Sequence, residues 1–184
     1  MKKFLIAVGV MLIVGCASYN SAIAPVQWET KNLTNDENIK VYVKKFNYDS
    51  CTGTIISITR TCGKGEISNF IIPALIDEKV SLANTVTDSN IVIDTLDVGI
   101  GRHATGLKTT TKLRLNSFEI TVISEVYDDS VWILRESHIK NSLTATAKVI
   151  AKIVKNNIGD NAEIKVKVYQ KDGKMVEYKD NTGL

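Results

Sequence analysis

The chain has 184 residues, of which 44% are hydrophobic, and its 23 basic and 20 acidic residues give a formal net charge of +3. This near balance, without a basic stripe, argues against a nucleic-acid-binding protein. The length fits one domain of ordinary size with a real hydrophobic core.

The first 16 residues predict a bacterial lipoprotein signal peptide. Lys2 and Lys3 precede an apolar run over residues 4–14, which is too short to span a membrane but has the length of a secretory h-region. Residues 13–16, Ile-Val-Gly-Cys, resemble the lipobox, so we expect cleavage before Cys16 and acylation of that cysteine. The alternative is an ordinary secreted protein with an accidental cysteine at the cleavage site. Cleavage would leave 21 basic and 20 acidic residues, a nearly neutral chain.

Three parts are expected: a signal peptide over residues 1–15, a lipidated N-terminus with a flexible tether over 16–37, and one domain over 38–184. Small and polar residues dominate the tether, whose span would be about 25 Å. Trp28 is its exception, and we expect it to dock onto the domain or near the membrane interface. Because Ala17 is not an aspartate, we expect the outer membrane and its periplasmic face, with surface exposure as the alternative.

The first predicted elements are a strand and a stapled hairpin. Apolar and polar residues alternate over residues 39–46, which predicts a half-buried strand. Cys51 and Cys62 form an even pair in an exported chain, which predicts a disulfide. The segment between them, residues 54–59, is rich in isoleucine and threonine and predicts a small hairpin or a strand excursion.

A helix is predicted over residues 68–83, capped by Ser68 or Asn69. Pro73 falls in or just after its first turn. The side chains expected to face inward are Phe70, Ile71, Ala74, Leu75 and Leu82. The next strand is expected over residues 91–100, in a central position, because its first residues are apolar on both faces.

The glycine-rich stretch over residues 99–106 is interpreted as a flexible connection. A dinucleotide-binding loop must open a helix, whereas this stretch leads into a strand predicted over residues 107–115. His103 beside Arg102 offers a weaker hypothesis, an anion site in that connection.

The strand from residue 107 is expected to continue across a bulge near Asn116 and Ser117 into residues 118–123, because the parity of its apolar face changes there. A turn at Asp128 and Asp129 should return the chain as a partner strand over residues 131–134.

The second helix is predicted over residues 143–158, with a cap at Asn141 or Ser142 and Gly159 at its end. The last element is a hairpin of residues 164–169 and 175–178, turning at Asp172 and Gly173.

These elements predict an α+β fold: a small antiparallel sheet of about five to six strands packed by two helices, with a C-terminal hairpin. The lipobox and the pattern over residues 90–159 resemble the YajG family of bacterial lipoproteins. Residues 91–93, 109–122 and 143–158 carry the resemblance. It implies a small antiparallel sheet covered by helices, and it transfers one functional residue, the acylated Cys16.

The sequence offers no constellation that we assign to catalysis, a cofactor or a metal. His103 and His138 stand apart, with no acidic residue at ligand spacing. We therefore expect a non-enzymatic binding or structural lipoprotein that contacts an envelope protein. The alternatives are an auxiliary lipoprotein of an envelope lipid-transport system and an enzyme acting on envelope polymers. The candidate contact is the terminal hairpin, with Lys165, Lys167 and Tyr169 on one face; alternatively, these lysines keep an edge strand from aggregating.

Overall fold

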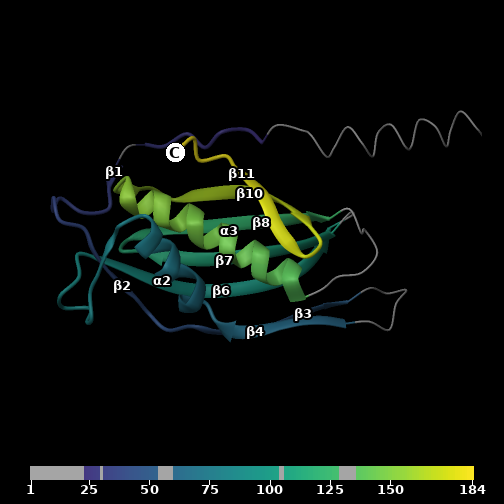
Figure 1. The fold of residues 1–184 in the computed structure, drawn as a ribbon. Helices are drawn as coiled ribbons and strands as arrows, with labels where there is room; N and C mark the ends of the chain where they lie inside the picture. Colours follow the sequence, from purple (N-terminus) through teal and green to yellow (C-terminus); the bar gives the residue numbers. More distant parts are fainter. Residues whose placement is uncertain (1–22, 30, 54–59, 104–105, 129–135) are drawn as a thin grey trace, which may run out of the picture.

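The computed structural model describes residues 23–29, 31–53, 60–103, 106–128 and 136–184, without the side chain of His103. Its centre is a curled, seven-stranded mixed sheet with both described helices on one face (Figure 1). In spatial order the strands are β11 (Lys174–Asp180), β10 (Ala162–Lys171), β8 (Phe118–Asp128), β7 (Gly106–Leu115), β6 (Ile91–His103), β2 (Lys40–Val43) and β5 (Ser81–Leu82).

Two short two-stranded ladders and two helices complete the described part of the fold. They are β1 (Lys31–Asn32) with β9 (Ile158–Gly159), β3 (Asn47–Gly53) with β4 (Arg60–Glu66), and the helices α2 (Ser68–Asp77) and α3 (Glu136–Lys155). The helix α3 crosses β7, β8, β10 and β11, and α2 packs beside it. The prediction of an α+β fold with two helices and a C-terminal hairpin agrees with this arrangement.

The prediction of a small antiparallel sheet is wrong, because the sheet has seven strands and mixed direction. The strand β8 pairs in parallel with β10, and β2 pairs in parallel with both β5 and β6. Parallel neighbours need a long crossover connection. The segment between β8 and β10 contains α3, and the segment between β2 and β5 contains α2, so the helices themselves supply the crossovers.

The predicted bulge at Asn116 and Ser117 is a two-residue hairpin turn between β7 and β8. Leu115 pairs with Phe118, and Asn116 has a positive φ of 54°. In such a hairpin, residues on one face have odd numbers before the turn and even numbers after it. The parity change therefore marks this hairpin turn, and the prediction of a bulge is wrong.

Both helices differ from their predicted bounds. The helix α2 ends at Asp77, so Leu82, which we expected to be buried within it, lies exposed in β5. The helix α3 begins at Glu136, five residues before the predicted cap, and ends at Lys155. After α3, Asn157 has a positive φ of 54°, so this asparagine takes the left-handed position expected of Gly159.

The glycine-rich stretch is mostly strand, which corrects its interpretation as a loop. Gly99 and Gly101 lie within β6, and Gly106 opens β7. The strands pair down to His103 and Gly106. The predicted return strand, residues 131–134, lies outside the described residues. The strand β8 pairs with β7 on one edge and with β10 on the other, and both edges are paired from Ile120 to Tyr127.

The core lies between the sheet and α3. Branched apolar side chains on β6, β7, β8 and β10 face one side of the helix, including the fully buried Leu113, Val122 and Val168. On α3, Leu143 and Ile150 are fully buried against them. The periodicity of a helix and the alternation of the strands place these residues on one interface.

The edge strand β11 is held against α3 by charged and aromatic contacts. Lys152 Nζ lies 3.3 Å from Asp180 Oδ2 and 5.2 Å from the ring centre of Tyr178. Burial lowers the pKa of Lys152, but the hydrogen bond with Tyr178 and the charge of Asp180 outweigh it and leave the pKa raised.

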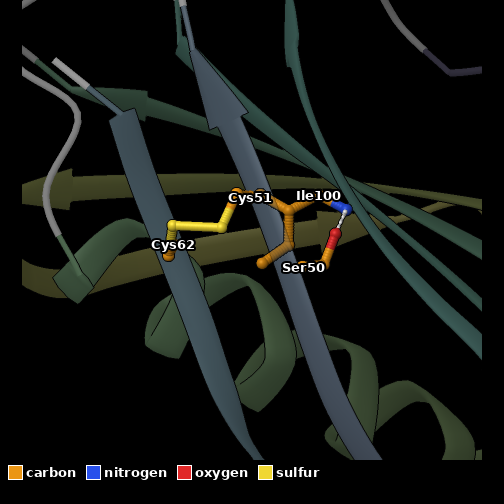
Figure 2. The surroundings of a disulfide bond; sticks show 4 residues. All are labelled: Ser50, Cys51, Cys62 and Ile100. Carbon is orange, nitrogen blue, oxygen red and sulfur yellow. Dashed lines mark hydrogen bonds between the residues drawn. A yellow bond between two sulfur atoms is a disulfide. The ribbon is translucent and has the colours of Figure 1, made fainter.

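The expected disulfide joins Cys51 and Cys62, which lie directly opposite each other in the β3–β4 hairpin (Figure 2). The hairpin lies beside β6, where the Ile100 N–H donates to Ser50 Oγ at 3.0 Å. A side chain at Gly63 would come within 3.0 Å of Ile100 and of a residue on α3, so this glycine allows the hairpin to pack closely. Residues 54–59 lie outside the described part.

The segment expected to be a tether belongs to the folded domain from residue 23 onward, apart from Thr30, which is not described. Trp28 Nε1 donates to the Thr182 carbonyl at 2.8 Å, and the Val26 N–H donates to the Asn181 carbonyl at 2.8 Å. Leu33 is buried in the core. The expectation that Trp28 docks onto the domain is confirmed, and Val26 and Leu33, which also precede the expected boundary at residue 38, contact the domain as well.

Candidate functional site

The face of the sheet opposite α3 is the candidate binding surface, which we call the open face. Among the described residues, no helix covers it. Its side chains alternate along each strand with those of the core, and most of them are polar or charged. In register across three strands stand Lys108 on β7, Glu125 on β8 and Lys167 on β10.

A cavity of about 480 Å³ opens on this face, and we call it the lysine cavity. The residues that line it are Ile23, Ala24, Lys108, Ile123, Glu125, Glu163, Lys165, Val166 and Lys167. Three strands supply its floor, and the docked N-terminal segment supplies one wall. Lys165 Nζ lies 3.8 Å from Glu163 Oε1, with both side chains more than half exposed, so this pair is solvated and weakly held.

A pair of tyrosines lies one row further along the same strands. The rings of Tyr127 and Tyr169 stack with centroids 5.7 Å apart, and Lys179 Nζ lies 5.6 Å from the centre of the Tyr169 ring. Tyr127 donates its hydroxyl to Glu125 Oε2 at 2.9 Å, which links the pair to the lysine cavity. Together with Glu177, which is exposed opposite Tyr169, we call this region the tyrosine end.

The predicted contact residues Lys165, Lys167 and Tyr169 do share the open face. They differ from the prediction in their place in the sheet, because β10 is an inner strand between β8 and β11, and β11 forms the edge. Lys167 is 9% exposed, so its side chain contributes mainly to the floor of the cavity. Lys165, Lys167 and Tyr169 can therefore take part in a contact through the open face, but not in a contact along the edge of the sheet.

A buried polar cluster that sequence reasoning missed lies at the start of α3. His138 Nε2 is 3.2 Å from Asp128 Oδ2, with side chains 2% and 8% exposed. Gln170 also donates to Asp128 Oδ2, at 2.9 Å, and accepts from Asn141 at 2.8 Å. Asp128 is the last residue of β8 and its side chain is buried, whereas the sequence pattern predicts a turn there.

Other predicted site residues can be placed as follows. Cys16 lies outside the described residues, and Arg102 is exposed near the end of β6. Within the described ranges, no group of three or more His, Cys, Asp or Glu side chains is arranged to hold a metal ion. Neither of the two described helices has the length and apolar character needed to cross a membrane.

Comparison of the chain with models of protein families, with curated proteins and with solved structures gives no match.

Proposed function

We propose that this chain is a lipid-anchored protein of the bacterial outer membrane, facing the periplasm, with a non-enzymatic binding or structural role. The tyrosine end of the open face is its contact surface for an envelope protein. The observation that carries the proposal is the stacked pair of Tyr127 and Tyr169 with Lys179 beside it, on a sheet face that the described helices leave uncovered.

The chemistry of the tyrosine end is that of a protein contact. Tyrosines are enriched in protein interfaces, because a large rigid ring with a polar end contributes area at little entropic cost. Here the strands hold Tyr169 in place, and charges of both signs, Lys179 and Glu177, stand beside it. The partner should therefore present complementary carboxylate and ammonium groups around an apolar patch.

The edge strand supports a contact through the face over strand addition along the edge. Lys174, Glu177 and Lys179 lie exposed along β11, and charged side chains hinder pairing with another strand. The lysines that protect the edge of the sheet from aggregation are therefore those of β11, Lys174 and Lys179. Lys165 and Lys167 lie on β10, an inner strand, and therefore belong to the open face.

The test is photo-crosslinking in cells. A photoreactive residue replaces Glu177, and a matched control places it at Lys64, which is exposed on the disulfide-linked hairpin at the other side of the sheet. We expect one reproducible protein partner at position 177, absent at position 64 and lost in a Tyr169→Ala variant that keeps its disulfide. Equal capture at both positions, or recovery of the monomer alone, would contradict the proposal.

The anchor is tested separately by mass. The mature protein should carry acyl chains on Cys16 and fractionate with the outer membrane. A Cys16→Ser variant that still fractionates with membranes, with an N-terminus of unchanged mass, would refute lipid anchoring.

A further inference from the structure

We propose that the lysine cavity binds the zwitterionic headgroup of a phosphoethanolamine-type phospholipid in the membrane that holds the anchor. This inference rests on the proposed function for the lipid at Cys16. It adds a ligand site beside the protein contact at the tyrosine end.

The first argument is the length of chain between anchor and cavity. Ile23 lines the cavity, and six residues separate it from Cys16. Seven Cα steps of about 3.3–3.6 Å reach at most about 25 Å. The docked segment, held by Val26 and Trp28, therefore keeps the cavity within that distance of the acylated cysteine. Headgroups of the same leaflet are then its nearest abundant ligands.

The second argument is charge complementarity. The cavity presents three lysines and two glutamates, so it suits a ligand with both a negative and a positive group better than a simple anion. A phosphate accepts charge-assisted hydrogen bonds from lysine, and an ammonium donates them to a carboxylate. Lys108, Glu125 and Lys167 stand in one row across adjacent strands. These strands are about 4.8 Å apart, similar to the separation of phosphate and ammonium in ethanolamine phosphate.

The third argument is the apolar part of the lining. Ile23 and Ile123 border the cavity together with Ala24 and Val166. Val166 is buried in the core, so the apolar side chains that match the glycerol and the first acyl carbons after a headgroup are those of Ile23, Ala24 and Ile123. The two glutamates also favour a primary ammonium over a quaternary one. Only the primary ammonium has N–H groups that form directed hydrogen bonds to carboxylates.

The experiment uses the lipidated mature protein in nanodiscs of phosphatidylcholine alone, with phosphatidylethanolamine, or with phosphatidylglycerol. Native mass spectrometry reads the acyl chains on Cys16 and any retained phospholipid in the same spectrum. We expect one retained phosphatidylethanolamine. The variants Lys165→Gln and Glu163→Gln should each lower the retained fraction about tenfold, the effect of losing one charged hydrogen bond. Lys112→Gln is the matched control, since this exposed lysine of β7 shares the open face but does not line the cavity.

Several outcomes would overturn the headgroup site. These are no retained lipid, equal retention of phosphatidylethanolamine and phosphatidylglycerol, or an equal loss with Lys112→Gln. Each leaves the acyl mass on Cys16 and the crosslink at position 177 unaffected, so the proposed function would stand. Absence of the acyl mass would instead refute the anchor, whichever lipid is retained.

Discussion

The docking of Trp28 gives the sharpest prediction, because the placement of the lysine cavity depends on it. Trp28→Phe keeps most of the ring and removes the bond to the Thr182 carbonyl, a loss of about 1 kcal/mol. Trp28→Ala also removes the half-buried ring. Truncation of a fully buried tryptophan costs about 3–5 kcal/mol, so we expect about 2 kcal/mol here.

Hydrogen exchange measured by NMR reports these losses locally. The Val26 amide, bound to the Asn181 carbonyl at 2.8 Å, should exchange about fivefold faster in Trp28→Phe and about 25-fold faster in Trp28→Ala. The amide of Val122 in the centre of β8 is the internal control and should not change. Unchanged exchange at Val26, or an equal increase at Val122, would show that Trp28 does not hold the N-terminal segment.

Three further predictions test the fold. Gly159→Ala would place a methyl 2.5 Å from Phe118 Cε2. We expect the free energy of unfolding, measured with urea, to fall by about 1–3 kcal/mol. The same substitution should cost less in a Phe118→Ala variant, which lacks the clashing ring. Asp128→Ala removes the carboxylate that contacts the buried His138 and Gln170 side chains, so it should cost about 1–3 kcal/mol, as expected for removing one partner of a buried hydrogen bond. Additive effects of Asp128→Ala and His138→Ala would contradict their coupling. The pKa of Lys152 is raised from its ordinary value of 10.5. Its stabilising effect is therefore present below that pH and is lost as the pH rises through the folded-state pKa. Above about pH 10.5 the free energy of unfolding should fall less steeply in Lys152→Met than in the natural protein.

Local patterns predicted the elements of this fold well. The Asp172 and Gly173 turn adopts positive φ angles of 52° and 75°, as its sequence demands. The period of α3 predicted its buried face. By contrast, the direction of β10 relative to β8 depends on where α3 returns the chain, and no residue within either strand encodes that.

The candidate site was harder to predict than the fold. Lys165, Lys167 and Tyr169 share a face because a strand alternates, which sequence reveals. Their neighbours Glu125 and Lys108 come from β8 and β7, and the sequence does not show the order of these strands beside β10. The same holds for Asp128 and His138, which are ten residues apart and meet because β8 ends where α3 begins.

The N-terminal segment shows most clearly what composition leaves out. Polar, small residues predict a flexible tether, yet backbone hydrogen bonds do not depend on side-chain polarity. Val26 donates its N–H to the C-terminal tail, and Glu29 donates its N–H to Asp160 Oδ2 at 2.9 Å. A polar segment can therefore dock through its backbone while one aromatic side chain, Trp28, supplies the apolar area.

With the proposed lipid at Cys16, the docked segment would also determine which side of the domain faces the membrane. A tether that ended at residue 37 would let the domain turn freely, and all its faces would reach the lipid equally. Because the fold begins by Ile23, the exit point lies beside the C-terminal tail, and the disulfide-linked hairpin of β3 and β4 lies on the other side of the sheet (Figure 1). In the proposed anchored state the lysine cavity would lie near the headgroups, and the hairpin would point away from them. We therefore expect the proposed partner of the tyrosine end to approach along the membrane surface.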